Sequence, residues 1–109
     1  MKSNNVKQHL EEELKDPYFK ELYELEEQKL QLVKPIIAYR IKHKLNQKQL
    51  ALKVGVTQQH ISKIESGDFS NMATLGKVLL YVGFSVHFQL IRLKPSVSRL
   101  IHKRGLQAA

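Results

Sequence analysis

Apolar side chains recur at helical spacing between Pro17 and Val33, and this pattern predicts an amphipathic helix. Asp16 can accept hydrogen bonds from the first free amides, and Pro17 suits the first helical position, so we expect the helix to begin there. Residues 6–14 predict a shorter, more polar helix. The apolar face of residues 17–33 must cover either the chain's own core or a partner, and the pattern leaves both open. This face carries Tyr18, Phe19, Leu22, Tyr23, Leu25, Leu30, Leu32 and Val33.

Further helices are expected over residues 35–44, 47–54, 58–66 and 72–82. Pro35 interrupts the first helical pattern. Because the residue before a proline disfavours the helical conformation, we expect a break or a kink at Lys34. Asn46 and Thr57 are suitable N-caps for the helices that follow them. Glycines follow three of the helical segments, where they can adopt the left-handed conformation that ends a helix: Gly55, Gly67 and Gly83.

The period of the pattern changes after residue 83. Val86, Phe88 and Leu90 alternate with polar residues, which predicts one β-strand within residues 85–94. A single strand leaves its backbone amides unpaired, and the simplest partner is the same strand of a second copy in a homodimer. Addition of the strand to the sheet of another protein is the alternative. Residues 95–109 form a basic tail, expected as a short helix or a disordered arm.

Charge divides the chain into two parts. Residues 1–33 carry five lysines against eight acids, a formal charge of −3. Residues 34–109 carry thirteen Lys or Arg against only Glu65 and Asp68, a formal charge of +11. So basic a segment suits a polyanion, nucleic acid first, although a solvated cationic surface is the alternative.

The residue inventory argues against several kinds of chemistry. The chain has no cysteine, which excludes disulfides, thiolate metal sites and cysteine nucleophiles. Its five histidines are scattered without ligand spacing, and no glycine-rich phosphate loop or nucleophile motif is present. We therefore expect no metal, no cofactor and no enzymatic activity. No apolar run approaches the ~18 residues that a membrane span needs, so the expected location is the cytoplasm.

Residues 46–67 carry the most informative pattern, that of two short helices joined by a tight turn. Ala51 lies where the two helices would cross, and Gly55 lies at the turn, where a positive φ is needed. The outer face of the second helix stays polar, which suits hydrogen bonding to base edges in a major groove. The side chains expected to be buried where the two helices meet are Leu50, Val54, Ile61 and Ile64.

The spacing Gln-x-x-Leu-Ala-x-x-x-Gly-Val over residues 47–56 and Ile-Ser-x-Ile-Glu-x-Gly over residues 61–67 resembles the helix-turn-helix of the lambdoid phage repressors and Cro proteins. The resemblance covers roughly residues 36–83 and implies binding to double-stranded operator DNA. It also implies an ion pair between Arg40 and Glu65. The residues implied to contact DNA are Asn46, Gln47, Thr57, Gln58, Gln59, His60, Ser62, Lys63 and Ser66. The loop 68–72 departs from the basic, proline-containing loop of many relatives, which puts its phosphate contacts in doubt.

A narrower resemblance concerns the two ends of the chain. The acidic extension with Asp16-Pro17-Tyr18-Phe19, the Thr74-Leu75 pair and a strand after Gly83 are similar to HigA-type antitoxins. This similarity implies neutralisation of a small basic RelE/HigB-like ribonuclease toxin, and repression of the chain's own operon as a dimer. The implied toxin contacts are Tyr18, Phe19, Leu22, Tyr23 and Leu25. The alternatives are a stand-alone transcriptional regulator without a toxin, and an adaptor that no longer reads DNA.

The sequence as a whole predicts an all-α fold. Its centre is a five-helix repressor-like domain over residues 35–84, preceded by an acidic helical extension over residues 1–34. A dimerisation strand over residues 85–94 and a basic tail over residues 95–109 are expected to follow.

Overall fold

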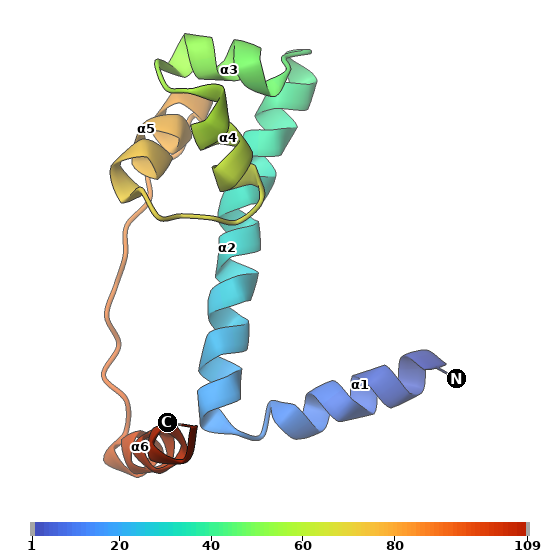
Figure 1. Cartoon of the computed structure of the whole chain (residues 1–109), viewed down its shortest axis with the longest axis vertical. Coiled ribbons are helices and arrows are strands. Elements are labelled where there is room, and N and C mark those ends of the chain that lie inside the picture. The colour runs from blue at the N-terminus through green and yellow to red at the C-terminus, as the bar shows by residue number, and fades with distance from the viewer. Residues whose placement is uncertain (1, 109) are drawn as a thin grey trace. The chain divides into compact units, whose positions relative to one another are not determined.

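The computed structural model describes residues 2–108, and the side chains of residues 5–104. The described residues are helical or irregular and contain no strand, as Figure 1 shows. The all-α prediction is therefore confirmed. The helices are α1 (Lys2–Glu13), α2 (Pro17–Lys42), α3 (Gln47–Val54), α4 (Gln58–Glu65), α5 (Met72–Val82) and α6 (Pro95–Ala108).

The chain divides into two compact units. Residues 28–88 form one of them, which we call the central unit. The residues up to Glu27 and those from Gln89 onward form the other, which we call the terminal unit. Helix α2 contributes its N-terminal turns to the terminal unit and its C-terminal turns to the central unit.

Helix α2 begins where the sequence predicts. The Asp16 carboxylate accepts a hydrogen bond from the amide of Tyr18 at 3.0 Å, and Pro17 is the first helical residue. Of the break and the kink left open at Lys34, the break is wrong, because α2 continues through Pro35 to Lys42. Val33 and Ile36 are both buried in the central unit, so packing on either side of Pro35 offsets the hydrogen bond that proline cannot donate.

Four helices cover the domain for which five were predicted. Residues 36–84 hold the C-terminal turns of α2 and the whole of α3, α4 and α5. The five-helix count is therefore wrong. The fifth helix was implied by the resemblance to repressors, whereas the helical pattern itself predicts four segments over residues 35–84, and the first of these continues α2.

One hydrophobic cluster holds the central unit together. It contains Ile36 from α2 and side chains from α3, α4 and α5, all at most 8% exposed. Partly buried residues, among them Val56 and Phe69, pack against it. The cluster consists of Ile36, Leu50, Ala51, Val54, Ile61, Ile64, Leu75, Val78, Leu79 and Val82.

The segment between α5 and α6 is extended but is not a strand. Gly83 ends α5 in the left-handed conformation at φ 103°. Within the described chain, the backbone of residues 85–93 forms no hydrogen bond with other backbone groups. The predicted strand over residues 85–94 is therefore wrong. Alternating side chains favour an extended backbone, but a strand also needs a neighbouring backbone to pair with, and the central unit offers it none.

The basic tail is helical, since α6 covers most of it. Within the terminal unit, the Arg104 guanidinium pairs with the Asp16 carboxylate and lies 5.6 Å from the centre of the Tyr18 ring. Phe19 and Tyr23 stack with ring centres 6.3 Å apart. The two contacts of Arg104 hold α6 against the start of α2 without burying any described side chain of the terminal unit.

Candidate nucleic-acid interface

The turn between α3 and α4 sets the angle at which the two helices meet. Gly55 adopts φ 86°, and both its amide and that of Val56 donate to the Ala51 carbonyl, at 2.8 and 3.0 Å. A left-handed residue here lets the chain reverse within two residues. Ala51 is 2% exposed, so the small side chain at the helix crossing is enclosed as predicted.

Helix α4 presents a polar outer face from its first turn. Thr57 caps the helix, its Oγ1 accepting from the amide of His60 at 3.1 Å. Gln58, Gln59, Ser62 and Lys63 are exposed, while Ile61 and Ile64 on the opposite face are buried. The exposed side chains are donors and acceptors that can reach base edges or phosphates, and none of them is used within the described chain.

The start of α3 is held in place by a reciprocal cap. The side chain of Asn46 accepts from the amide of Gln49 at 2.7 Å, and the side chain of Gln49 accepts from the amide of Asn46 at 2.8 Å. Gln47, the next residue of the predicted interface, donates from Nε2 to Glu65 at 3.2 Å. The side chain of Gln47 therefore links the first turn of α3 to the last turn of α4.

An ion pair fixes the C-terminal end of α4 against α2. Nε and Nη2 of Arg40 contact the two carboxylate oxygens of Glu65 at 2.8 and 3.0 Å, and Nη1 donates to the Leu45 carbonyl at 3.2 Å. The side chains are 21% and 7% exposed. Two parallel hydrogen bonds between planar groups allow little rotation. The pair therefore holds α2, α3 and α4 in one arrangement.

The loop after α4 is organised by short-range hydrogen bonds. The Ser66 hydroxyl donates to the Lys63 carbonyl at 2.8 Å, so Ser66, predicted to contact DNA, closes its own helix. The Asp68 carboxylate accepts from the amide of Ser70 at 3.1 Å. Asn71 caps α5 through the amide of Thr74 at 3.0 Å. This cap was not predicted, although an asparagine before an apolar helical pattern signals one.

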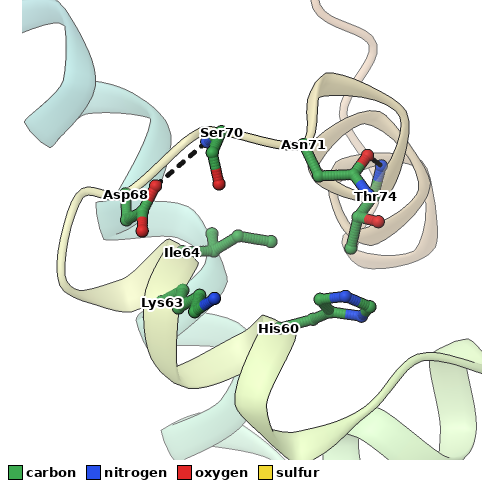
Figure 2. A pocket seen from close by; sticks show the side chains of 7 residues that line it. All are labelled: His60, Lys63, Ile64, Asp68, Ser70, Asn71 and Thr74. Atoms are coloured by element: carbon green, nitrogen blue, oxygen red, sulfur yellow. Dashed lines mark hydrogen bonds between the residues drawn. The ribbon is translucent and has the colours of Figure 1, made fainter.

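A small cavity lies behind the polar face, between α4, the following loop and the start of α5 (Figure 2). Its volume of about 20 Å³ admits a single water molecule. The Nδ1 atom of His60 is buried and has no hydrogen-bond partner among the described residues. The His60 ring is therefore less accessible to an outside ligand than the exposed side chains of Gln58 and Gln59. The cavity is lined by His60, Lys63, Ile64, Asp68, Ser70, Asn71 and Thr74.

Lys77 of α5 supports the turn from the other side. Its Nζ donates to the Gly55 carbonyl at 3.3 Å. A Cβ on Gly55 would lie 3.5 Å from the same Nζ. No local sequence signal predicts this contact, because the two residues are far apart in the chain and meet only through the packing of α5 on α3.

The five residues predicted to contact a toxin lie on the part of α2 that belongs to the terminal unit. Tyr18, Leu22 and Leu25 are 38%, 47% and 50% exposed, and Phe19 and Tyr23 are half-buried. The negative charge of Glu27 raises the pKa of the Tyr23 phenol, with smaller contributions from burial and from a hydrogen bond to the same carboxylate. Tyr23 is therefore a neutral hydrogen-bond donor at ordinary pH.

Comparison with known proteins identifies the domain. Residues 36–84 match the family model described as Helix-turn-helix. No curated protein and no solved structure matches the chain significantly. The chain thus carries a helix-turn-helix domain of the lambda repressor and Cro-like kind, which indicates a sequence-specific DNA-binding regulator of transcription.

The described residues form neither a membrane span nor a metal cluster. No helix in the described part of the chain has the length and apolarity needed to cross a membrane. Among residues 2–108, no three His, Cys, Asp or Glu side chains come together as metal ligands.

Proposed function

We propose that this protein is an antitoxin that neutralises a small basic ribonuclease toxin and represses its own operon as a homodimer. The DNA-binding part rests on the helix-turn-helix domain. The toxin-binding part rests on the terminal unit, where exposed apolar side chains lie in the acidic part of the sequence.

The observation that carries the DNA-binding proposal is the exposed polar face of α4 on a rigid support. Gln58 and Gln59 extend from the first turn of a capped helix whose opposite face is buried. A glutamine side chain pairs well with the N6 and N7 atoms of adenine. We propose that these two glutamines and Lys63 contact base edges, while Asn46 and Gln47 contact phosphates.

The toxin-binding proposal depends on side chains that the chain itself leaves uncovered. Leu22 and Leu25 are about half exposed although they belong to the predicted apolar face of α2. Glu21, Glu24 and Glu26 lie between and beside them in the sequence. Apolar contacts with a rim of negative charge fit a cationic protein surface, and opposite charges speed the encounter of the two partners.

The homodimer follows from how repressors read DNA. Two copies of a helix-turn-helix bind half-sites about one helical turn apart, so a symmetric operator implies a two-fold symmetric protein. Analytical ultracentrifugation with and without a duplex from the chain's own upstream region measures this directly. A single copy on the duplex at saturation would contradict the dimer.

A pull-down with the native flanking genes tests the antitoxin proposal. The tagged protein is expressed together with its neighbouring DNA, and bound proteins are identified by mass spectrometry. We expect a small basic protein, encoded next door, that is toxic when expressed alone. The Leu22→Glu/Leu25→Glu variant is expected to lose this partner while keeping DNA binding. Recovery of the chain alone would favour a stand-alone transcriptional regulator.

A binding measurement tests the base-reading role of α4. Gln58→Ala is expected to weaken binding to the cognate operator by ~1–3 kcal/mol and to leave binding to random DNA almost unchanged. Gln31→Ala is the matched control, since Gln31 is an exposed glutamine of α2 outside the predicted interface. An equal loss of affinity on operator and random DNA for Gln58→Ala would contradict base reading.

A further inference from the structure

A second basic surface lies outside the helix-turn-helix domain, at the start of α6. The side chains of Arg92, Arg99 and His102 line one open hollow, together with Ser98. Leu93 and Pro95 complete its lining. The hollow thus combines two guanidinium groups, an imidazole and a hydroxyl, all of which can donate hydrogen bonds to an anion.

The cationic groups of this hollow have no partner within the described chain. Arg92 and Arg99 are exposed and form no hydrogen bond or ion pair there. Arg104, on the same helix as Arg99, differs because it pairs with Asp16 and packs over Tyr18. One arginine of α6 therefore docks the helix, while the arginines of the hollow remain available.

The surrounding sequence offers these arginines no acid. Residues 69–109 contain six Lys or Arg and neither Asp nor Glu. Like charges that line one hollow repel each other, and the repulsion falls when an anion lies between them. A bound polyanion would therefore lower the electrostatic repulsion within the hollow.

We propose that the hollow formed by Arg92, Ser98, Arg99 and His102 binds the phosphate backbone of DNA, as a contact additional to that of the helix-turn-helix. The inference rests on the DNA-binding part of the proposed function. The guanidinium groups of Arg92 and Arg99 bind phosphate oxygens through paired hydrogen bonds, and Ser98 and His102 add donors. Such contacts add affinity on any sequence and leave the choice of operator to α4.

Double-stranded DNA is the occupant that the observations favour. The helix-turn-helix domain of the same chain is proposed to bind double-stranded DNA, which would offer phosphates to this hollow as well. The described part of α6 has no exposed Phe, Tyr or Trp side chain for an unpaired base of single-stranded RNA to stack on, and His102 is its one aromatic ring. Arg92 and Arg99, which line the same hollow, can bind neighbouring phosphates of the regularly spaced duplex backbone.

The salt dependence of binding tests the proposal. The double variant Arg92→Ala/Arg99→Ala is measured on a random duplex and on a duplex from the chain's own upstream region. We expect the slope of log K against log salt to fall in magnitude by about 2 per bound chain, since each phosphate contact contributes about 0.9. Affinity at low salt is expected to fall roughly tenfold on both duplexes, with their ratio unchanged.

Two control variants separate this effect from general charge. Lys7→Ala/Lys15→Ala removes the same amount of positive charge from exposed positions of the terminal unit and is expected to change the slope little. Arg92→Lys/Arg99→Lys keeps the charge and is expected to retain most of the slope. Circular dichroism should show the same helix content in all variants, since the substituted side chains are exposed.

The outcomes also separate this proposal from the base-reading proposal. An unchanged slope in Arg92→Ala/Arg99→Ala, or an equal change in Lys7→Ala/Lys15→Ala, would overturn the phosphate site. The phosphate site on DNA would also be overturned if Arg92→Ala/Arg99→Ala kept its binding to the duplexes but lost binding to a single-stranded RNA of the same length. Failure of α4 to read bases would instead show as no preference for the upstream duplex, with the slope still dependent on Arg92 and Arg99.

Discussion

The central and terminal units differ in whether they bury apolar side chains. Every buried apolar side chain among residues 5–104 lies in the central unit, between Val33 and Val82. In the terminal unit, Leu22, Leu25 and Ile91 are between 47% and 81% exposed. The central unit therefore holds a hydrophobic core of its own, although it also exposes large apolar side chains such as Leu52 and Phe88, whereas the terminal unit buries none of its described apolar side chains.

This difference assigns most of the stability to the central unit. Apolar area removed from water is the main favourable term in folding, so the free energy of unfolding is expected to come mostly from residues 28–88. Exposed apolar side chains gathered on one segment are typical of interaction surfaces. Substitutions in the two units should therefore separate loss of stability from loss of partner binding.

The largest expected effect is the removal of a core side chain. Leu79→Ala is expected to lower the free energy of unfolding by ~2–5 kcal/mol, because Leu79 is 1% exposed and its loss leaves a cavity. Leu25→Ala in the terminal unit is expected to change it by less than about 0.5 kcal/mol. Denaturant unfolding followed by circular dichroism measures both. Equal losses would mean that the terminal unit shares the core in solution.

The two arginine ion pairs provide a second contrast. Arg40→Ala leaves the Glu65 carboxylate, 7% exposed, with only the hydrogen bond from Gln47, and we expect a loss of ~2–3 kcal/mol. Arg104→Ala breaks an exposed pair with Asp16 and is expected to cost at most ~1 kcal/mol. Thermal unfolding at low and high salt distinguishes them, since salt screens the exposed pair more strongly. A larger loss for Arg104→Ala would reverse the assignment of stability.

Two glycines of the central unit differ in whether their backbone conformation requires glycine. Gly55→Ala is expected to destabilise by ~1–2 kcal/mol, because φ is 86° at the turn between α3 and α4. Gly76→Ala is expected to stabilise by ~0.5–1 kcal/mol, because Gly76 lies inside α5 and a Cβ there meets no atom within 4 Å. Stabilisation by Gly55→Ala would show that the turn is not constrained as described.

The local signals in the sequence were sufficient for most of the central unit. Asn46, Thr57 and Gly55 lie at helix ends where their own chemistry determines the conformation, so the boundaries of α3 and α4 could be read from the chain. The pairing of Arg40 with Glu65 was also accessible, because few acids follow residue 33 and the resemblance to repressors named both residues.

The wrong predictions share a physical cause. Pro35 disfavours a helix locally, but the burial of Val33 and Ile36 on the core keeps α2 continuous. Val86, Phe88 and Leu90 alternate as in a strand, but pairing depends on a second backbone that lies beyond the local sequence. In both places the tertiary surroundings outweighed the local preference.

The sequence by itself determined the helical periodicity, the caps, the glycine turn and the division of charge, since each depends on neighbours within a few residues. Only the tertiary structure decided that the apolar side chains of residues 18–25 stay unburied, since burial depends on what another segment brings against them. It also decided that Lys77 supports the turn at Gly55 and that Arg104 docks α6 while Arg92 and Arg99 stay unpaired. These contacts join residues distant in the chain, and no local pattern encodes them.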